Sequence, residues 1–196
     1  LALDEVKPGA LLTPQGKILF DFLVSRVEGG IRLDVRRDVA DDFLRRLTLY
    51  RLRAKATFDK RDQALVAVSW DADSSASWLR DTRFPADAPV RRSYAQAATA
   101  DASAEDWHRL RIACGIAESP YDYALGEAFP HDVLLDQTGG VGMRKGCYVG
   151  QEVVSRMQHR GTARRRVLLI KGESTLPATG TPVTANGRPL GVLGSV

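Results

Sequence analysis

The stretch from Lys145 to Glu152, here called the cysteine motif, constrains this chain more than any other; it reads Lys-Gly-Cys-Tyr-Val-Gly-Gln-Glu. Two glycines flank the cysteine, and glycine permits backbone dihedrals and close approaches that other residues forbid. Arg144 and Lys145 precede Cys147, and cationic neighbours favour the reactive thiolate form of a cysteine. Ordinary core helices and strands do not combine these residue types, so we interpret the motif as a segment built around its thiol.

The composition is typical of a soluble globular protein: 196 residues, of which 44% are apolar and 27% are charged. The apolar runs at 64–68 and 167–170 are far shorter than the roughly 20 residues that span a bilayer. No secretory signal precedes them, so we expect a cytoplasmic protein in a bacterium or a mitochondrial-matrix protein in a eukaryote, with no membrane partner. The chain begins at Leu1 and ends within a strand-like pattern at Val196, so we expect the natural protein to extend beyond both ends.

Positive charge is concentrated directly after the cysteine motif. The net charge is +4, and the cluster consists of Arg156, Arg160, Arg164, Arg165 and Arg166. A basic surface in contact with solvent is the simpler interpretation of such a cluster, and a face that binds nucleic-acid phosphates is the alternative.

The chain has two cysteines, Cys114 and Cys147. Their separation matches no zinc-binding pattern, and an iron–sulfur cluster normally takes four protein ligands. We therefore expect no self-sufficient metal site. Any metal centre that involves Cys147 needs most of its ligands from elsewhere.

Two familiar kinds of active site do not fit the cysteine motif. In a phosphate-binding P-loop, glycine precedes the lysine and serine or threonine follows it, whereas Lys145 follows arginine and precedes glycine. A protease-like cysteine needs a histidine within reach. The candidates are His108, His131 and His159, and sequence spacing cannot place any of them near Cys147.

Two interpretations of the motif therefore remain open. In the first, Tyr148 stacks on a flat heteroaromatic ligand whose edges bond to Gln151 and Glu152. In the second, the motif is a tight turn in which Glu152 caps the following helix and Cys147 is simply buried.

Hydrophobic periodicity predicts an α+β arrangement in the first part of the chain. Strands at 17–24 and 31–35 form a hairpin, and a helix begins at Asp38. Two more strands are expected at 55–58 and 64–70. This order favours helices packed on a mostly antiparallel sheet.

Asp21 interrupts the apolar run of the first expected strand. From this local pattern we interpret it as an acid that faces outward or is paired across strands.

A polar linker over 71–104 marks a boundary before the next expected helix. Ser103 and Asp106 have capping-box spacing, and they open a helix that Gly115 ends. Cys114 falls on its apolar face, so we interpret Cys114 as a core residue.

The last part of the chain begins with an irregular segment, 118–142, and long ordered segments of this kind are often functional. A helix over 151–159 and a strand over 164–171 follow. The short β segments after them indicate a small β-barrel that is cut short.

The cysteine motif, with the four residues that follow it, resembles the signature of the YgfZ-type folate-binding proteins, which are relatives of the glycine-cleavage aminomethyltransferase. The segments Leu12–Asp21, Leu110–Ile116 and Phe129–Asp132 also resemble that family. Nearly the whole chain is covered by the resemblance.

This resemblance implies an aminomethyltransferase-like multi-domain α+β fold with antiparallel sheets and helices around a central pocket, followed by a truncated β-barrel. Residues 1–33 and 84–162 would form a folate-binding-like domain, 34–83 an inserted α+β subdomain, and 163–196 the incomplete barrel. The implied role is an accessory function in iron–sulfur cluster assembly or repair, with tetrahydrofolate as cofactor. The implied partners are iron–sulfur client or assembly proteins, including tRNA-modifying enzymes, and we expect a monomer.

The resemblance also implies roles for individual residues. Cys147 and Asp21 would carry the chemistry. The expected folate contacts are Lys145, Tyr148, Gln151, Glu152, Arg111 and Gln15.

Two departures from the family pattern limit the expected enzyme chemistry. Ala113 stands where the aminomethyltransferases have a glutamate that holds the pterin, and Phe20 replaces the first of two adjacent acids. We therefore expect no glycine-cleavage activity. Two alternatives remain: a tetrahydrofolate-dependent one-carbon transferase that uses Asp21, and a basic RNA-binding module.

Overall fold

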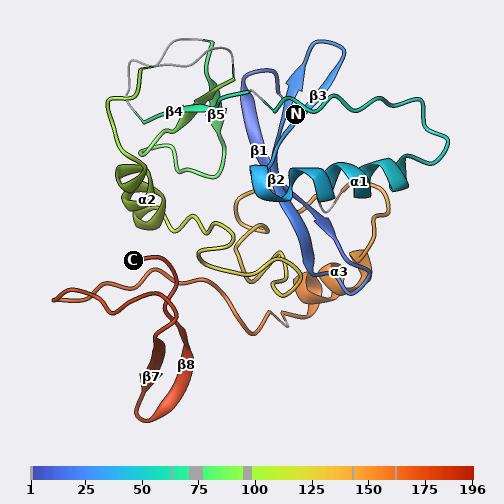
Figure 1. Ribbon diagram of the computed structural model, residues 1–196. Helices are drawn as coiled ribbons and strands as arrows, with labels where there is room; N and C mark the ends of the chain where they lie inside the picture. The colour runs from blue at the N-terminus through green and yellow to red at the C-terminus, as the bar shows by residue number, and fades with distance from the viewer. Residues whose placement is uncertain (1, 63, 71–76, 95–98, 143, 162) are drawn as a thin grey trace.

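The computed structural model describes residues 2–62, 64–70, 77–94, 99–142, 144–161 and 163–196 (Figure 1). Within these residues, six strands form one mixed sheet in the order β3-β2-β1-β5-β6-β4, and two more form a separate hairpin. The strands are β1 (Glu5–Leu12), β2 (Ile18–Val27), β3 (Gly30–Asp34), β4 (Ala67–Ser69), β5 (Leu79–Asp81), β6 (Arg91–Ser93), β7 (Pro182–Ala185) and β8 (Arg188–Val192). The helices are the 3₁₀ turn η1 (Arg37–Val39), α1 (Ala40–Arg51), α2 (Ala104–Ala113) and α3 (Gln151–Arg160).

The predicted hairpin is confirmed as β2 and β3, but the pattern did not predict β1, which pairs antiparallel with β2. Pro8 and Gly9 interrupt the β1 sequence, and both residues are depleted in strands. Glycine at position 9 leaves room for the ring of Phe22, because a Cβ there would lie 2.8 Å from that ring. In the described part of the chain, β5 pairs with β1 only at Glu5 and Val6, so β5 does not cover the edge of β1 at Pro8.

The predicted first helix is confirmed as α1, which begins at Ala40 rather than at Asp38. Phe43 is its buried residue, and the ring centroid of Phe43 lies 5.3 Å from those of both Phe20 and Phe22 on β2. This aromatic contact fixes α1 across the sheet (Figure 1).

The predicted strands at 55–58 and 164–171 are wrong, and the one over 64–70 is confirmed only in part. Residues 55–58 are exposed and form no strand, and of the predicted strand over 64–70 only β4 forms, paired with β6 instead. The predicted strand over 164–171 is also irregular; its backbone is tied to the preceding segment by Val167 N donating to Asp132 O at 2.8 Å.

The two later helices are confirmed. Ser103 and Asp106 form the capping box of α2, and Gly115, just past its end, has a φ of +69°. Cys114 is half-buried and packs against a small core of Phe84, Val90 and Ile116. Part of the predicted linker, at 71–76 and 95–98, lies outside the described residues.

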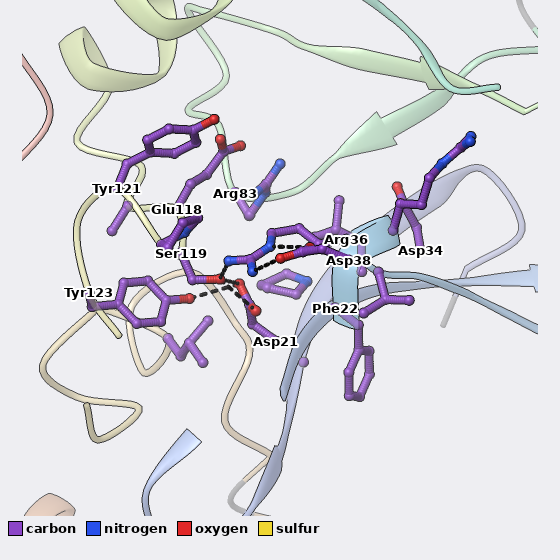
Figure 2. Close-up of a pocket in the computed structure, with 18 of the residues that line it drawn as sticks. Asp21, Phe22, Asp34, Arg36, Asp38, Arg83, Glu118, Ser119, Tyr121 and Tyr123 are labelled. Carbon is purple, nitrogen blue, oxygen red and sulfur yellow. Dashed lines mark hydrogen bonds and ion pairs between the residues drawn. The ribbon is translucent and has the colours of Figure 1, made fainter. Parts of the chain in front are cut away.

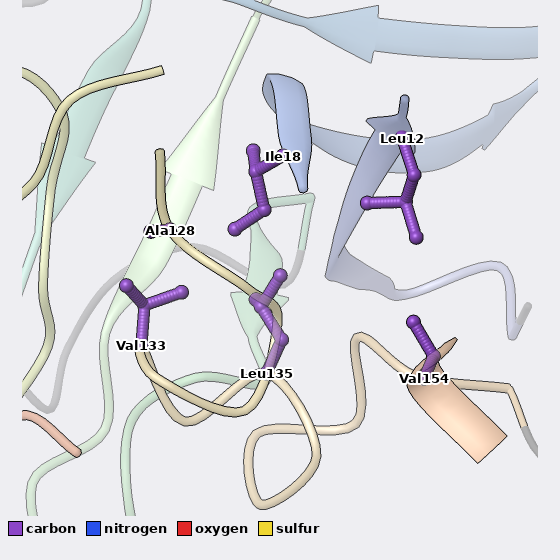
Figure 3. Packing of buried hydrophobic residues seen from close by; sticks show 6 residues of the cluster. All are labelled: Leu12, Ile18, Ala128, Val133, Leu135 and Val154. Atoms are coloured by element: carbon purple, nitrogen blue, oxygen red, sulfur yellow. The ribbon is translucent and has the colours of Figure 1, made fainter. Parts of the chain in front are cut away.

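The irregular segment over 118–142 is confirmed and is anchored to the start of β2. Gly126 N donates to Ile18 O at 2.7 Å, and Ile18 N donates to Ala128 O at 2.9 Å. The main core lies between this segment, the β1–β2 hairpin and α3 (Figure 3); its members are Leu12, Ile18, Ala128, Val133, Leu135 and Val154.

The β7–β8 hairpin turns at Asn186 and Gly187, which both have positive φ, and it projects from the rest of the chain (Figure 1). No helix among the described residues is long and apolar enough to span a bilayer. The α+β class is confirmed, whereas the division into three units stays a prediction.

Candidate functional site

A cavity of approximately 600 Å³ opens where β2, the residues after β3 and the start of the irregular segment meet (Figure 2). Its polar lining is rich in both acids and arginines. Its polar lining includes Asp21, Asp34, Arg36, Arg37, Asp38, Arg83, Arg92, Glu118, Ser119 and Tyr123.

Asp21 projects into this cavity from β2. Its carboxylate accepts hydrogen bonds from Ser119 Oγ at 2.9 and 3.1 Å and from Tyr123 OH at 2.9 Å. Its register partner across the strands is Ala10, so the interpretation of Asp21 as an outward-facing or cross-strand-paired acid is wrong. The local sequence pattern could not predict these hydrogen bonds, because Ser119 and Tyr123 lie 98 and 102 positions after Asp21 in the chain.

Arg36 extends the same network on the other side of Ser119. Its Nη1 donates to Ser119 Oγ at 2.9 Å, and its Nε and Nη2 donate to the two carboxylate oxygens of Asp38 at 3.0 and 2.6 Å. The hydrogen bond to Asp38 raises the pKa of Arg36 and lowers that of Asp38. Burial and the charge of Asp21 raise the pKa of Tyr123, so its hydroxyl stays a donor.

The opposite wall is held by a buried carboxylate. Asp81 is 1% exposed and accepts from Arg83 Nη2 at 2.7 Å and Arg92 Nε at 2.9 Å. Burial disfavours its charge, but the hydrogen bonds and charges of the two arginines outweigh burial and lower the pKa of Asp81. Arg92 also reaches Asp34 at 3.2 Å.

The acids of the cavity differ in their partners. Ion pairs connect Asp34, Asp38 and Glu118 with Arg92, Arg36 and Arg111, respectively. Among the hydrogen bonds of the described residues, Asp21 instead accepts from hydroxyl groups. Its remaining lone pairs are therefore available to N–H donors of a ligand.

The cysteine motif lies apart from the walls of this cavity. Cys147 is exposed, which contradicts the interpretation of a simply buried cysteine. Gly150 has a φ of +81°, and a Cβ there would lie 2.6 Å from Thr13 O, so the motif is packed directly on the β1–β2 turn. Gln15 is exposed on that same turn.

Three other residues of the motif, Lys145, Tyr148 and Gln151, contact one another. Lys145 Nζ lies 4.4 Å from the centroid of the Tyr148 ring, and Tyr148 N donates to Gln151 Oε1 at 3.3 Å. Glu152 pairs with Arg156 at 2.7 Å on the exposed face of α3. The structure thus brings Lys145, Tyr148 and Gln151 together, and it places Asp21 elsewhere; their roles toward a ligand stay predictions.

Arg111 is buried rather than exposed to the cavity, with 1% of its surface accessible. It donates to Asp122 at 2.7 Å and to Ser195 Oγ at 2.6 Å, and it pairs with Glu118 at 3.3 Å. Glu118 lines the cavity, whereas Ala113 is exposed on α2. The carboxylate on this wall therefore comes from Glu118, and the alanine at 113 removes none of the lining.

The arginine cluster after the motif is partly committed to intramolecular ion pairs. Arg156 pairs with Glu152, and Arg166 donates to both carboxylate oxygens of Asp136 at 3.0 and 2.8 Å. These pairs reduce the positive charge that the cluster offers to phosphates, and the RNA-binding alternative stays a prediction. Across the described ranges, no group of three or more His, Cys, Asp or Glu side chains is placed to hold a metal ion.

Residues 164–196 match the family model described as the CAF17 C-terminal β-barrel domain. This match supports the predicted barrel at the end of the chain. The aminomethyltransferase-like arrangement of the remaining residues and the YgfZ-type signature stay predictions.

Several similar proteins are named iron–sulfur cluster assembly factor IBA57 or its homologue, mitochondrial. The chain is 32% identical to the protein of Pyricularia oryzae, over 81% of this chain and 46% of that protein. It is 34% identical to the protein of Chaetomium globosum, over 81% of this chain and 43% of that protein. The human protein is 27% identical over 92% of this chain and 59% of its own length. The chain thus spans about half the length of the relatives it matches.

Proposed function

We propose that this chain belongs to an accessory protein for iron–sulfur cluster assembly or repair that acts through Cys147. The observation that carries the proposal is the similarity, over 81% of the chain, to proteins named iron–sulfur cluster assembly factors. The cluster is the cargo of such a protein. Because one exposed thiol cannot hold a cluster alone, the remaining ligands belong to a client or an assembly partner.

The setting of Cys147 supports this role. The thiol is exposed, while the motif around it is held by the contact of Gly150 with the β1–β2 turn and by the stacking of Lys145 on Tyr148. An exposed thiol on an anchored segment can reach a metal in a partner without unfolding of the chain.

We further propose that the large cavity binds tetrahydrofolate or a related folate. Its volume of approximately 600 Å³ lies within the usual range for ligand pockets. Asp21 offers a hydrogen-bond acceptor to the N–H groups of a pterin-like ring, and Arg37, which also lines the cavity, suits the carboxylates of a folate tail.

The names of the same relatives, which include the word mitochondrial, support a proposal for the cellular location of this protein. We propose the mitochondrial matrix for a eukaryotic source and the cytoplasm for a bacterial one. The partners would be iron–sulfur clients, including tRNA-modifying enzymes, and the protein would act as a monomer.

Complementation tests the role of Cys147. The full-length protein carrying Cys147→Ala should fail to restore iron–sulfur enzyme activity in cells that lack this factor, whereas Cys114→Ala, which removes the half-buried second thiol, should restore it. Equal abundance and circular dichroism spectra of the two variants would exclude misfolding. Normal enzyme activity with Cys147→Ala would rule out the proposed role.

A second candidate function, a tetrahydrofolate-dependent one-carbon transferase, is favoured by one observation: Asp21 lines the cavity and accepts hydrogen bonds from two hydroxyl groups. Calorimetric titration with tetrahydrofolate should show binding by the wild type and at least tenfold weaker binding by Asp21→Asn, the difference that about 1.4 kcal/mol produces. Turnover of a methylamine-type donor that depends on Asp21 would support the transferase. Absence of both binding and turnover would remove the folate proposal.

A further inference from the structure

Leu135 separates the large cavity from a smaller cavity under the cysteine motif. The smaller cavity has a volume of approximately 30 Å³, and Lys145 and Tyr148 of the motif are among its lining residues. Leu135 lines both cavities. A space of about the volume of one water molecule leaves room for a neighbouring side chain to move.

The backbone around Leu135 leads directly toward the motif. Its carbonyl oxygen accepts hydrogen bonds from Gly140 N at 2.7 Å and from Val141 N at 3.1 Å. A Cβ at Gly140 would lie 2.9 Å from Leu135 Cδ2, so any larger residue at position 140 would displace the Leu135 side chain. The glycine-rich segment before the motif is therefore packed on Leu135.

Figure 3 shows Leu135 pointing from its loop into the group formed with Leu12, Ile18 and Val154. Tyr148 packs against this same core, and Lys145 covers the Tyr148 ring. Cys147 is the residue directly before Tyr148 and is exposed, so packing beneath the Tyr148 ring can restrict the motion of the thiol.

We propose that Leu135 is a positioning residue through which a ligand in the large cavity controls the accessibility of the Cys147 thiol. The inference rests on the proposed ligand binding in that cavity. A ligand that presses on Leu135 moves the Leu135 side chain into the smaller cavity. The side chain then fills the space under Tyr148. The motif is then held more tightly and the thiol reacts more slowly, and departure of the ligand reverses the change.

Site-resolved alkylation tests this coupling in the full-length protein. Iodoacetamide labelling followed by peptide mass spectrometry reads both cysteines at once. Calorimetry first gives the tetrahydrofolate concentration that saturates the protein. At that concentration Cys147 should be alkylated about fivefold more slowly than in the ligand-free protein, which is the low end of typical coupling between two sites. Cys114 packs in the other core and should keep its rate. Saturation without a change at Cys147 would overturn the proposal.

A comparison without ligand separates this proposal from the folate proposal. Leu135 and Val133 are core residues with 9% and 8% exposure, but Val133 lines neither cavity. Leu135→Ala enlarges the space under the motif and should speed alkylation of Cys147 about fivefold relative to Val133→Ala. Equal rates in the two variants would overturn the role of Leu135.

A third variant adds atoms to the smaller cavity rather than removing them. Its expected effect on Cys147 is opposite to the faster alkylation that partial unfolding would cause. Ala10 also lines the smaller cavity, so Ala10→Val should fill it and slow alkylation of Cys147 in the absence of ligand. An unchanged rate in a folded Ala10→Val protein would contradict the proposal. If tetrahydrofolate does not bind, the proposed ligand is wrong, and these two ligand-free comparisons still decide whether packing at Leu135 controls the reactivity of Cys147.

Discussion

At the scale of single residues, Asp81 determines whether two arginines of the cavity wall can remain buried. Its carboxylate bonds to both Arg83 and Arg92 and is 1% exposed. Asp81→Asn would leave two buried cations without their shared anion, so we expect a loss of about 3 kcal/mol or more in the free energy of unfolding, measured by urea denaturation. Asp59→Asn removes the acid from an exposed pair with Arg61 and should change this free energy by less than about 0.5 kcal/mol.

The pH dependence of stability provides an independent check on Asp81. Its pKa is lowered from the ordinary value of 3.8 in the folded protein. A lowered folded-state pKa contributes stability that is present above the unfolded value and is lost as the pH falls through the folded value. The wild type should therefore lose stability below about pH 4 more steeply than Asp81→Asn. Parallel curves for the two proteins would show that Asp81 contributes no acid-linked stability.

Residue-level predictions succeeded where the signal was local and failed where it was not. The capping box of Ser103 and Asp106 spans three positions, and its side-chain chemistry specifies the geometry. Ser119 is separated from Arg36 by 83 positions and from Asp21 by 98, so no local pattern could join them. The length of the irregular segment predicts a functional role for it. The segment supplies Ser119 and Tyr123 to the cavity wall, but its length alone could not identify these two residues.

At the scale of elements, Gly150 joins α3 to the β1–β2 turn. It has a positive φ, and a Cβ would collide with Thr13 O at 2.6 Å. Gly161 at the other end of α3 also has a positive φ, but its Cβ position is open. We expect Gly161→Ala to cost about 1 kcal/mol from backbone strain alone. Gly150→Ala should cost at least about 2 kcal/mol more because the turn must also move.

Urea denaturation of these two matched variants measures the difference. Similar losses of unfolding free energy would mean that the contact between the motif and the β1–β2 turn is unimportant for stability. Site-resolved alkylation of Gly150→Ala should also show faster reaction of Cys147, since the motif loses its anchor.

The element predictions show why β-propensity alone is insufficient. Residues 55–58 and 164–171 have suitable side chains, yet neither forms a strand in the described chain, because a strand also requires a neighbouring backbone with which to pair. β1 forms despite Pro8 and Gly9 because its partner β2 lies directly after it and its buried side chains, such as Val6, anchor the register. Helices were easier to predict, since their hydrogen bonds are internal.

At the scale of the whole molecule, Arg111 connects the cavity wall with the C-terminal segment. It bonds to Asp122 and Ser195, and Ser195 N donates to the same Asp122 carboxylate at 2.7 Å. Arg111→Met keeps the apolar stem but leaves Asp122 and Glu118 without the guanidinium, so we expect a loss of about 3 kcal/mol in the free energy of unfolding. Residues 164–196 should also be released faster in limited proteolysis.

Arg109→Met provides the matched control for this connection, because Arg109 lies on the same helix and forms exposed pairs with Glu105 and Asp106. It should change the unfolding free energy by less than about 0.5 kcal/mol and leave the proteolysis rate unaltered. If Arg111→Met loses stability but releases the C-terminal segment at the wild-type rate, the arginine supports only the cavity wall. Faster release in Arg111→Met alone would show that one buried guanidinium holds the C-terminal segment against the residues that form the cavity.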